Sequence, residues 1–195
     1  MSQLSLYPLS KPVALFEEFI ATQPQTLVLK ERIFSLTGDS FEIKFDNGAP
    51  FLKVTGAWPS FSGRKKVEDM RGNHLFDICK EHMHIHTTYV MKEPDGNTIC
   101  EVKNSHKIIG SKATTTFTDP GANEVTLTMS GNWMDHIANV VEEQTGETVA
   151  RISRKLFTAR HMFFGKDNYS VIVAPGVDMA LIAGLCICFD EKNND

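Results

Sequence analysis

The chain of 195 residues is long enough for one domain with a full hydrophobic core. Hydrophobic residues make up 42% and charged residues 23%, which is typical of a soluble globular protein. The formal net charge of −4 argues against bulk attraction to nucleic acid. No segment reaches the length of a membrane span, and the N-terminus lacks the pattern of a secretory signal. We therefore predict one domain over residues 1–195.

The N-terminal part predicts a short amphipathic helix and then strands. Residues 12–21 begin at a proline and bring four apolar side chains to one helical face. Residues 26–34 are rich in strand-forming residues, and residues 40–46 alternate strictly between apolar and charged side chains. Asn47-Gly48 is a strong hairpin signal, after which residues 51–55 return as the next strand.

Turn signals then recur at short and regular spacing along the chain. The strand candidates between them are residues 73–80, 83–91, 97–103, 112–118, 124–130, 132–140, 147–153 and 169–174. Many short strands at such spacing are typical of an antiparallel sandwich or barrel.

The apolar run at residues 179–189 predicts a buried helix. A helix that is apolar on every side must be buried in protein or in lipid. Eleven residues rise only about 16 Å, roughly half of a hydrocarbon core, so we place this helix inside the protein. Asp178 is positioned to cap its first turn. A mainly β protein with one apolar helix suggests a barrel closed around a helix of residues 177–190.

The four cysteines are predicted to be reduced thiols. Cys186 and Cys188 lie in the buried helix, Cys79 and Cys100 lie in predicted strands, and no CxxC pair suggests a zinc site. This cysteine usage indicates a cytosolic or nuclear protein, with peripheral attachment to a membrane as a further option.

Six segments carry a resemblance that covers residues 12–194. They are TLVLKE (26–31), LTGDSFEI (36–43), GNHLFDI (72–78), SGNW (130–133), VARISRK (149–155) and VAPGVDMALI (173–182). The chain resembles the LURP-one-related family of the tubby C-terminal-like superfamily, which also includes tubby proteins and phospholipid scramblases, and it looks most like the fungal branch. The resemblance implies a barrel of about twelve strands around a central C-terminal helix. It also implies a protein without an established enzymatic activity or cofactor, whose best-defined relatives bind phosphoinositide headgroups or move phospholipids.

Residues 103–112 are similar to the headgroup-binding stretch of tubby proteins, which runs Lys-x-Arg, two polar residues, two apolar residues and Gly-Thr-Lys. Lys103 matches the first basic position, and residues 108–112 match the tail. Ser105 stands where the arginine would be, but Lys107 follows on the same side of a strand and can compensate. Lys103, Lys107 and Lys112 are therefore the predicted headgroup site, and an ordinary solvated strand face is the alternative.

A second group of cations follows Gly63. Arg64, Lys65 and Lys66 are expected in a loop, where they could add a contact with an anionic membrane. The alternative is that these charges serve solubility alone.

The run His82-Met83-His84-Ile85-His86 is the sharpest metal-like pattern. On one strand, His82, His84 and His86 would share a face, and two imidazoles could reach one zinc ion. The opposite face is apolar, so the histidines are expected to face solvent, and no native metal is predicted. A metal-dependent β-barrel enzyme is the weakest functional alternative.

The leading prediction is a non-enzymatic adaptor or membrane-tethered signalling protein that associates with phospholipids or phosphoinositides. The alternative is a protein-interaction scaffold in stress or defence signalling that has no lipid ligand. The expected partners are anionic headgroups in the first case and signalling proteins in the second.

Overall fold

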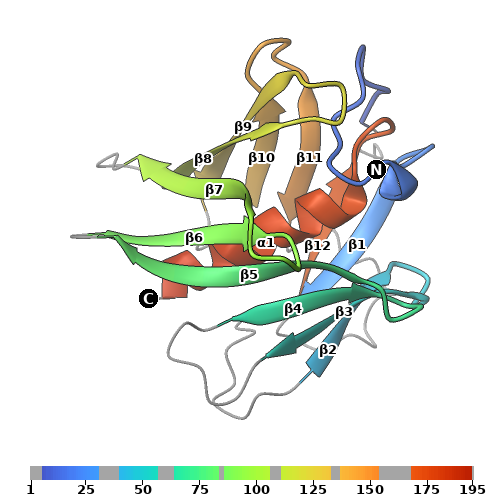
Figure 1. The fold of residues 1–195 in the computed structure, drawn as a ribbon. Coiled ribbons are helices and arrows are strands. Elements are labelled where there is room, and N and C mark those ends of the chain that lie inside the picture. The colour runs from blue at the N-terminus through green and yellow to red at the C-terminus, as the bar shows by residue number, and fades with distance from the viewer. Residues whose placement is uncertain are drawn as a thin grey trace.

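The computed structural model describes residues 6–30, 40–56, 64–83, 86–105, 111–132, 137–153 and 168–194. In this part of the chain, twelve strands form a closed barrel and one long helix runs through it (Figure 1). Every pair of neighbouring strands is antiparallel. The structure confirms the predicted closed antiparallel barrel around a buried C-terminal helix.

The strands follow one another around the barrel in chain order, and β1 closes it by pairing with both β2 and β12. Their bounds are β1 Gln25–Lys30, β2 Ser40–Phe45, β3 Pro50–Gly56, β4 Lys65–Asp69, β5 His74–Met83, β6 His86–Lys92, β7 Thr98–Ser105, β8 Ser111–Thr118, β9 Glu124–Asn132, β10 Ile137–Glu142, β11 Thr148–Ser153 and β12 Asn168–Val173.

The helix α1 spans Met179–Asn194, and all its residues from 180 to 189 are buried. It begins two residues later and ends four residues later than the predicted helix of residues 177–190. It packs against β6 and β7, and its Gly184 lies close to side chains of the wall. A Cβ at this position would lie 2.8 Å from Cε of Met91 and 3.0 Å from Cε2 of Phe76. The absence of a side chain at Gly184 therefore lets the helix lie close to Met91 and Phe76.

The buried Asp178 holds the first turn of α1 and a distant segment together. Its Oδ1 accepts hydrogen bonds from the N–H groups of Ala180 and Leu181, which is the predicted helix cap. Its Oδ2 accepts hydrogen bonds from the N–H groups of Leu15 and Phe16. One carboxylate thus ties residues 6–21, which we call the N-terminal segment, to the start of the helix.

The helix predicted for residues 12–21 is wrong. The only helical turn there is a 3₁₀ turn over Glu17–Phe19, and the segment instead pairs with the chain that precedes α1. Val13 forms a parallel bridge with Val177, and Ile20 forms an antiparallel bridge with Asp178. Backbone groups that form hydrogen bonds with residues 175–178 are no longer available for the i to i−4 bonds of a helix.

Two strand predictions also need correction. Lys65 and Lys66, expected in a loop, belong to β4, which lies between β3 and β5. The predicted strand 132–140 corresponds to β10, which starts at Ile137, while residues 133–136 lie outside the described part of the chain.

The alternating direction of the strands gives the barrel two different ends. The turns at residues 46–49, 70–73, 93–97, 119–123 and 143–147 all lie where the N-terminal segment meets the start of α1, and we call this the turn end. Helix α1 runs from there to the opposite end, which we call the exit end (Figure 1). Within the described part, the predicted headgroup residues Arg64, Lys65, Lys66, Lys103 and Lys112 lie in or next to strand segments that adjoin the exit end.

Candidate functional site

The hairpin of β7 and β8 brings two of the three predicted headgroup lysines close together. Lys103 pairs with Thr114, and Ser105 pairs with Lys112. Because Val102 and Ala113 point into the core, Lys103 and Lys112 are diagonal neighbours on the outer face of the barrel. Lys107 lies outside the described residues.

Both described lysines of this hairpin have carboxylate partners. Nζ of Lys103 lies 3.1 Å from Oε2 of Glu101, and the Lys103 side chain is 70% exposed. Nζ of Lys112 lies 3.9 Å from Oε1 of Glu143. Exposed ion pairs of this kind are worth at most about 1 kcal/mol, so a phosphate group can replace the carboxylate without a large cost.

Threonine hydroxyls lie beside these lysines on β8 and β9, and the sequence alone did not predict this. Thr114 Oγ1 lies 3.3 Å from Thr128 Oγ1 across β8 and β9, and Thr116 forms the equivalent contact with Thr126 at 3.1 Å. Thr128 also donates a hydrogen bond to the Glu143 carboxylate that faces Lys112. The run of three threonines at 114–116 was the available signal, but only the strand register shows that Thr114 lies beside Lys103.

The second predicted group of cations, Arg64, Lys65 and Lys66, does not form a loop with three exposed charges. Lys65 lies on the inner side of β4 with Val67 and is only 4% exposed, so it does not belong to the outer surface. Lys66 forms an ion pair of 2.7 Å with Glu68. Arg64 donates a hydrogen bond to Asp77, and this bond raises the pKa of the guanidinium.

Asp77 is a buried carboxylate on the outer side of β5, covered in part by the Arg64 side chain. Nε2 of His74 lies 3.1 Å from its Oδ1, but within the described residues neither atom makes a hydrogen bond of acceptable geometry. The positive charge of Arg64 therefore neutralises the carboxylate of Asp77, and this ion pair gives Arg64 a structural role.

The three histidines do not lie along one strand. β5 ends at Met83 and β6 begins at His86, so the chain reverses within the run, and Met83 pairs with His86. His82 and His86 thus belong to two neighbouring strands, and the prediction of one shared strand face is wrong. The side chains of His82 and His86, and the whole of His84, lie outside the described part. Within that part, no group of three or more His, Cys, Asp or Glu side chains is arranged to hold a metal ion.

A small cavity lies between α1 and the wall of β7 to β10. Its volume is about 10 Å³, and its lining includes Leu127, Met129, Leu185 and Phe189. This space holds about one water molecule and is far too small for a headgroup or an acyl chain. This cavity therefore cannot hold a lipid ligand.

Among the described residues, no helix is both long enough and apolar enough to span a bilayer.

Comparisons with known proteins identify relatives along nearly the full chain. A family model described as LURP-one-related matches residues 25–190. Protein LURP-one-related 15 of Arabidopsis thaliana is 24% identical over 194 residues, which cover 96% of this chain and 89% of that protein. Protein LURP-one-related 5 of the same plant is 26% identical, with 92% and 88% covered. The X-ray structure of an Arabidopsis thaliana protein is 19% identical, covers 93% of this chain and 99% of that one, and has a TM-score of 0.44. These relatives are plant proteins, so the likeness to a fungal branch stays a prediction.

Proposed function

Because the chain belongs to the LURP-one-related family, we propose that it is a non-enzymatic adaptor that docks on anionic phospholipid headgroups. The ligand class comes from the resemblance to tubby proteins and scramblases. The docking surface is the outer face of the β7–β8 hairpin.

The observation that carries this proposal is the diagonal placement of Lys103 and Lys112 on one outer face. Two ammonium groups at this spacing can contact the oxygens of one phosphorylated headgroup, and hydroxyls such as that of Thr114 supply further donors. The cavity beside α1 is too small for a headgroup, which supports binding on an outer face.

A second candidate function is a protein-interaction scaffold without a lipid ligand. One observation favours it, namely that Lys66, Lys103 and Lys112 each already face a carboxylate of the same chain. In such a scaffold these pairs stabilise the wall and no headgroup displaces them.

The two functions are separated by the triple variant Lys103→Glu, Lys107→Glu and Lys112→Glu. If the hairpin docks headgroups, the variant loses at least tenfold in affinity for vesicles of phosphatidylcholine and phosphatidylinositol phosphate, because three attractions of up to about 1 kcal/mol each become repulsions. Cosedimentation of the untagged protein measures the loss.

A matched control makes the same change in charge elsewhere. The triple variant Lys11→Glu, Lys53→Glu and Arg71→Glu changes exposed residues outside the β7–β8 hairpin. It is expected to bind within a few-fold of the wild type at physiological salt. Equal losses in both triple variants would reject a specific headgroup surface on β7 and β8, and unchanged binding in both would favour the scaffold.

A further inference from the structure

The side chain of Glu143 lies where an anion can bind on the outer wall of the barrel. Its Oε1 accepts a hydrogen bond from the hydroxyl of Thr128 and lies 3.9 Å from Nζ of Lys112. Both groups therefore face the same carboxylate oxygen, although Thr128 belongs to β9 and Lys112 to β8. Lys112 pairs with Ser130, so Thr128 is its diagonal neighbour on the outer face. The carboxylate thus marks a position at which an ammonium group and a hydroxyl converge on one anionic oxygen.

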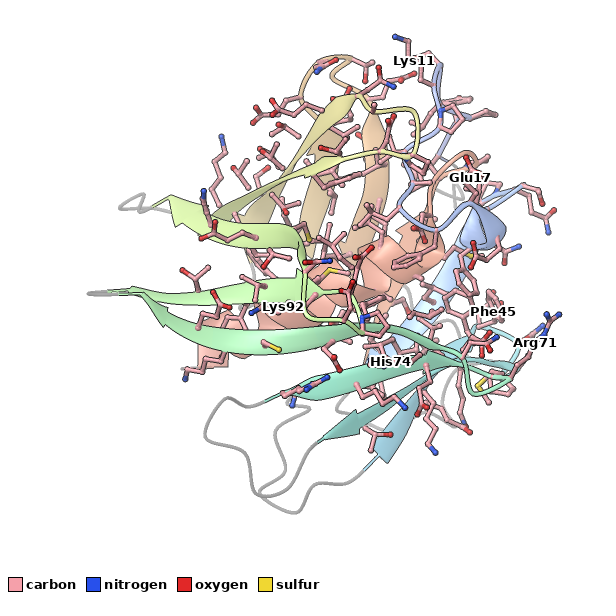
Figure 2. The ribbon with its side chains drawn as sticks, in the orientation of Figure 1. Lys11, Glu17, Phe45, Arg71, His74 and Lys92 are labelled. Atoms are coloured by element: carbon pink, nitrogen blue, oxygen red, sulfur yellow. The ribbon has the colours of Figure 1, made fainter. Side chains whose placement is uncertain are left out.

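The side chain of Glu143 is held weakly in this position. Its ion pair with Lys112 is the longest that the described residues form between a lysine or arginine and a carboxylate. By comparison, Nζ of Lys92, which Figure 2 labels, lies 2.5 Å from Oε1 of Glu81. Glu143 belongs to the turn between β10 and β11, and its side chain is 46% exposed. It can therefore turn into solvent while its backbone N–H keeps the hydrogen bond to the carbonyl of Thr126.

The charges of this face do not favour an anion while Glu143 is in place. Strands β7, β8 and β9 carry the cations Lys103 and Lys112 and the carboxylates of Glu101 and Glu124. With Glu143 added, two cations meet three carboxylates, which is a net charge of −1. A phosphate monoester carries more charge than a carboxylate and offers three acceptor oxygens, so it is the stronger ligand for the same donors.

We propose that Lys112 and Thr128 form a phosphate-binding position beside the β7–β8 hairpin, that Glu143 occupies it in the free protein, and that a lipid headgroup phosphate displaces Glu143. This inference rests on the proposed function and adds a binding residue, Thr128, and an internal competitor, Glu143. Lys103, the diagonal neighbour of Lys112 on β7, supplies a second ammonium group to the headgroup. Because the carboxylate has to leave, the protein binds headgroups more weakly than it would without Glu143.

The variant Glu143→Gln tests the displacement. It keeps the shape of the side chain but removes its charge, so we expect about three- to fivefold tighter binding to vesicles of phosphatidylcholine and phosphatidylinositol phosphate at physiological salt. The matched control is Glu124→Gln, which removes an exposed charge from the outer face of β9 that forms no ion pair within the described residues. The control is expected to gain less than about twofold. Cosedimentation of the untagged proteins measures both affinities.

A Lys112→Ala background separates displacement from a general effect of charge. The ammonium group that Glu143 faces is then absent. In this background we expect Glu143→Gln to change the affinity by less than about twofold. Equal gains in both backgrounds, or a gain no larger than that of Glu124→Gln, overturn the displacement and leave the headgroup-docking function intact.

The role of the Thr128 hydroxyl is tested in the Glu143→Gln background. There, Thr128→Val removes a donor to the phosphate and should weaken vesicle binding by about three- to tenfold. The matched control is Thr126→Val in the same background, because the Thr126 hydroxyl instead faces Thr116 at 3.1 Å. The control should stay within about twofold. Equal losses in both variants, with urea unfolding showing that both are folded, overturn Thr128 as a binding residue.

Two further outcomes separate this inference from the proposed function. Absence of vesicle binding by both the wild type and Glu143→Gln overturns both proposals. Soluble inositol trisphosphate, measured by calorimetry, tests the source of the phosphate. Binding of this probe by Glu143→Gln without binding to vesicles supports the phosphate position and overturns the lipid as its ligand.

Discussion

At the scale of single residues, Asp178 joins the two ends of the chain. It accepts four backbone hydrogen bonds, two from the start of α1 and two from the N-terminal segment, and it is fully buried. Burial raises the pKa of this carboxyl group to about 6, although the four N–H donors favour its charged form.

We expect Asp178→Ala to destabilise the protein by about 2–4 kcal/mol at pH 7. The variant leaves four N–H groups without their acceptor, two of them in the buried first turn of a helix. Urea unfolding measures the change, and the exposed Glu18→Ala variant is the control, expected within about 0.5 kcal/mol of the wild type. A loss no larger than that of the control would show that Asp178 does not hold the segment in place.

The contribution of Asp178 to the stability of the fold changes with pH in a direction that its pKa determines. Between its ordinary pKa of 3.8 and its folded pKa of about 6, the native protein keeps a proton that the unfolded chain has released. The stability that the Asp178 carboxyl group contributes is therefore fully present below pH 3.8 and is lost as the pH rises through about 6. The cost of Asp178→Asn should accordingly shrink between pH 4 and about pH 6, as measured by urea unfolding. A cost that grows over this range would mean that hydrogen bonding outweighs burial.

At the scale of elements, the fit between α1 and the wall depends on Gly184. The helix is apolar on every side, so its sequence does not show which face meets which strand. The close approach of Gly184 to Met91 and Phe76 identifies the face that touches β5 and β6. Both neighbours are fully buried, and the Phe76 ring stacks on Phe16 of the N-terminal segment at 5.6 Å.

Gly184→Ala should destabilise the protein by about 1–2 kcal/mol, although alanine is the better helix former. Overpacking against Phe76 and Met91 costs about 1–3 kcal/mol, which exceeds the helix-propensity gain of about 1 kcal/mol. In a Met91→Ala background the same change should be neutral or stabilising, because the closest neighbour is then absent. A double-mutant cycle by chemical unfolding measures this coupling. An increase in stability in the wild-type background would contradict the packing described.

At the scale of the whole molecule, the features that are local in sequence were predictable. Turn residues such as Asn47-Gly48 mark the hairpins, and an apolar helix too short for a membrane must be enclosed. Features that depend on distant pairing were not predictable. Residues 12–21 have a helical pattern, but Asp178 lies more than 150 positions away and takes up their N–H groups. The helical pattern of residues 12–21 is therefore outweighed by hydrogen bonds to a residue that is distant in the sequence.

The candidate site, too, was only partly predictable from the sequence. The lysines of residues 103–112 could be named from the sequence, and Glu101, the partner of Lys103, lies two residues away on the same strand. Glu143, the partner of Lys112, lies in a turn two strands beyond β8, so only the fold shows this ion pair. The burial of Lys65 is also non-local, because a run of three cations ordinarily predicts an exposed loop. Of the predicted headgroup cations in the described part, the structure therefore leaves Lys103, Lys112 and Lys66 on the outer surface, with the charge of Arg64 balanced by Asp77.

The most direct test of headgroup docking is vesicle cosedimentation of the untagged wild-type protein. Phosphatidylcholine vesicles with and without phosphatidylinositol phosphates are compared at low and at physiological salt. The account predicts binding that requires the anionic lipid and weakens several-fold as salt rises, because exposed lysines supply the attraction. Equal binding to both kinds of vesicle, or no binding at low salt, would contradict headgroup docking and leave the protein-interaction scaffold as the function to pursue.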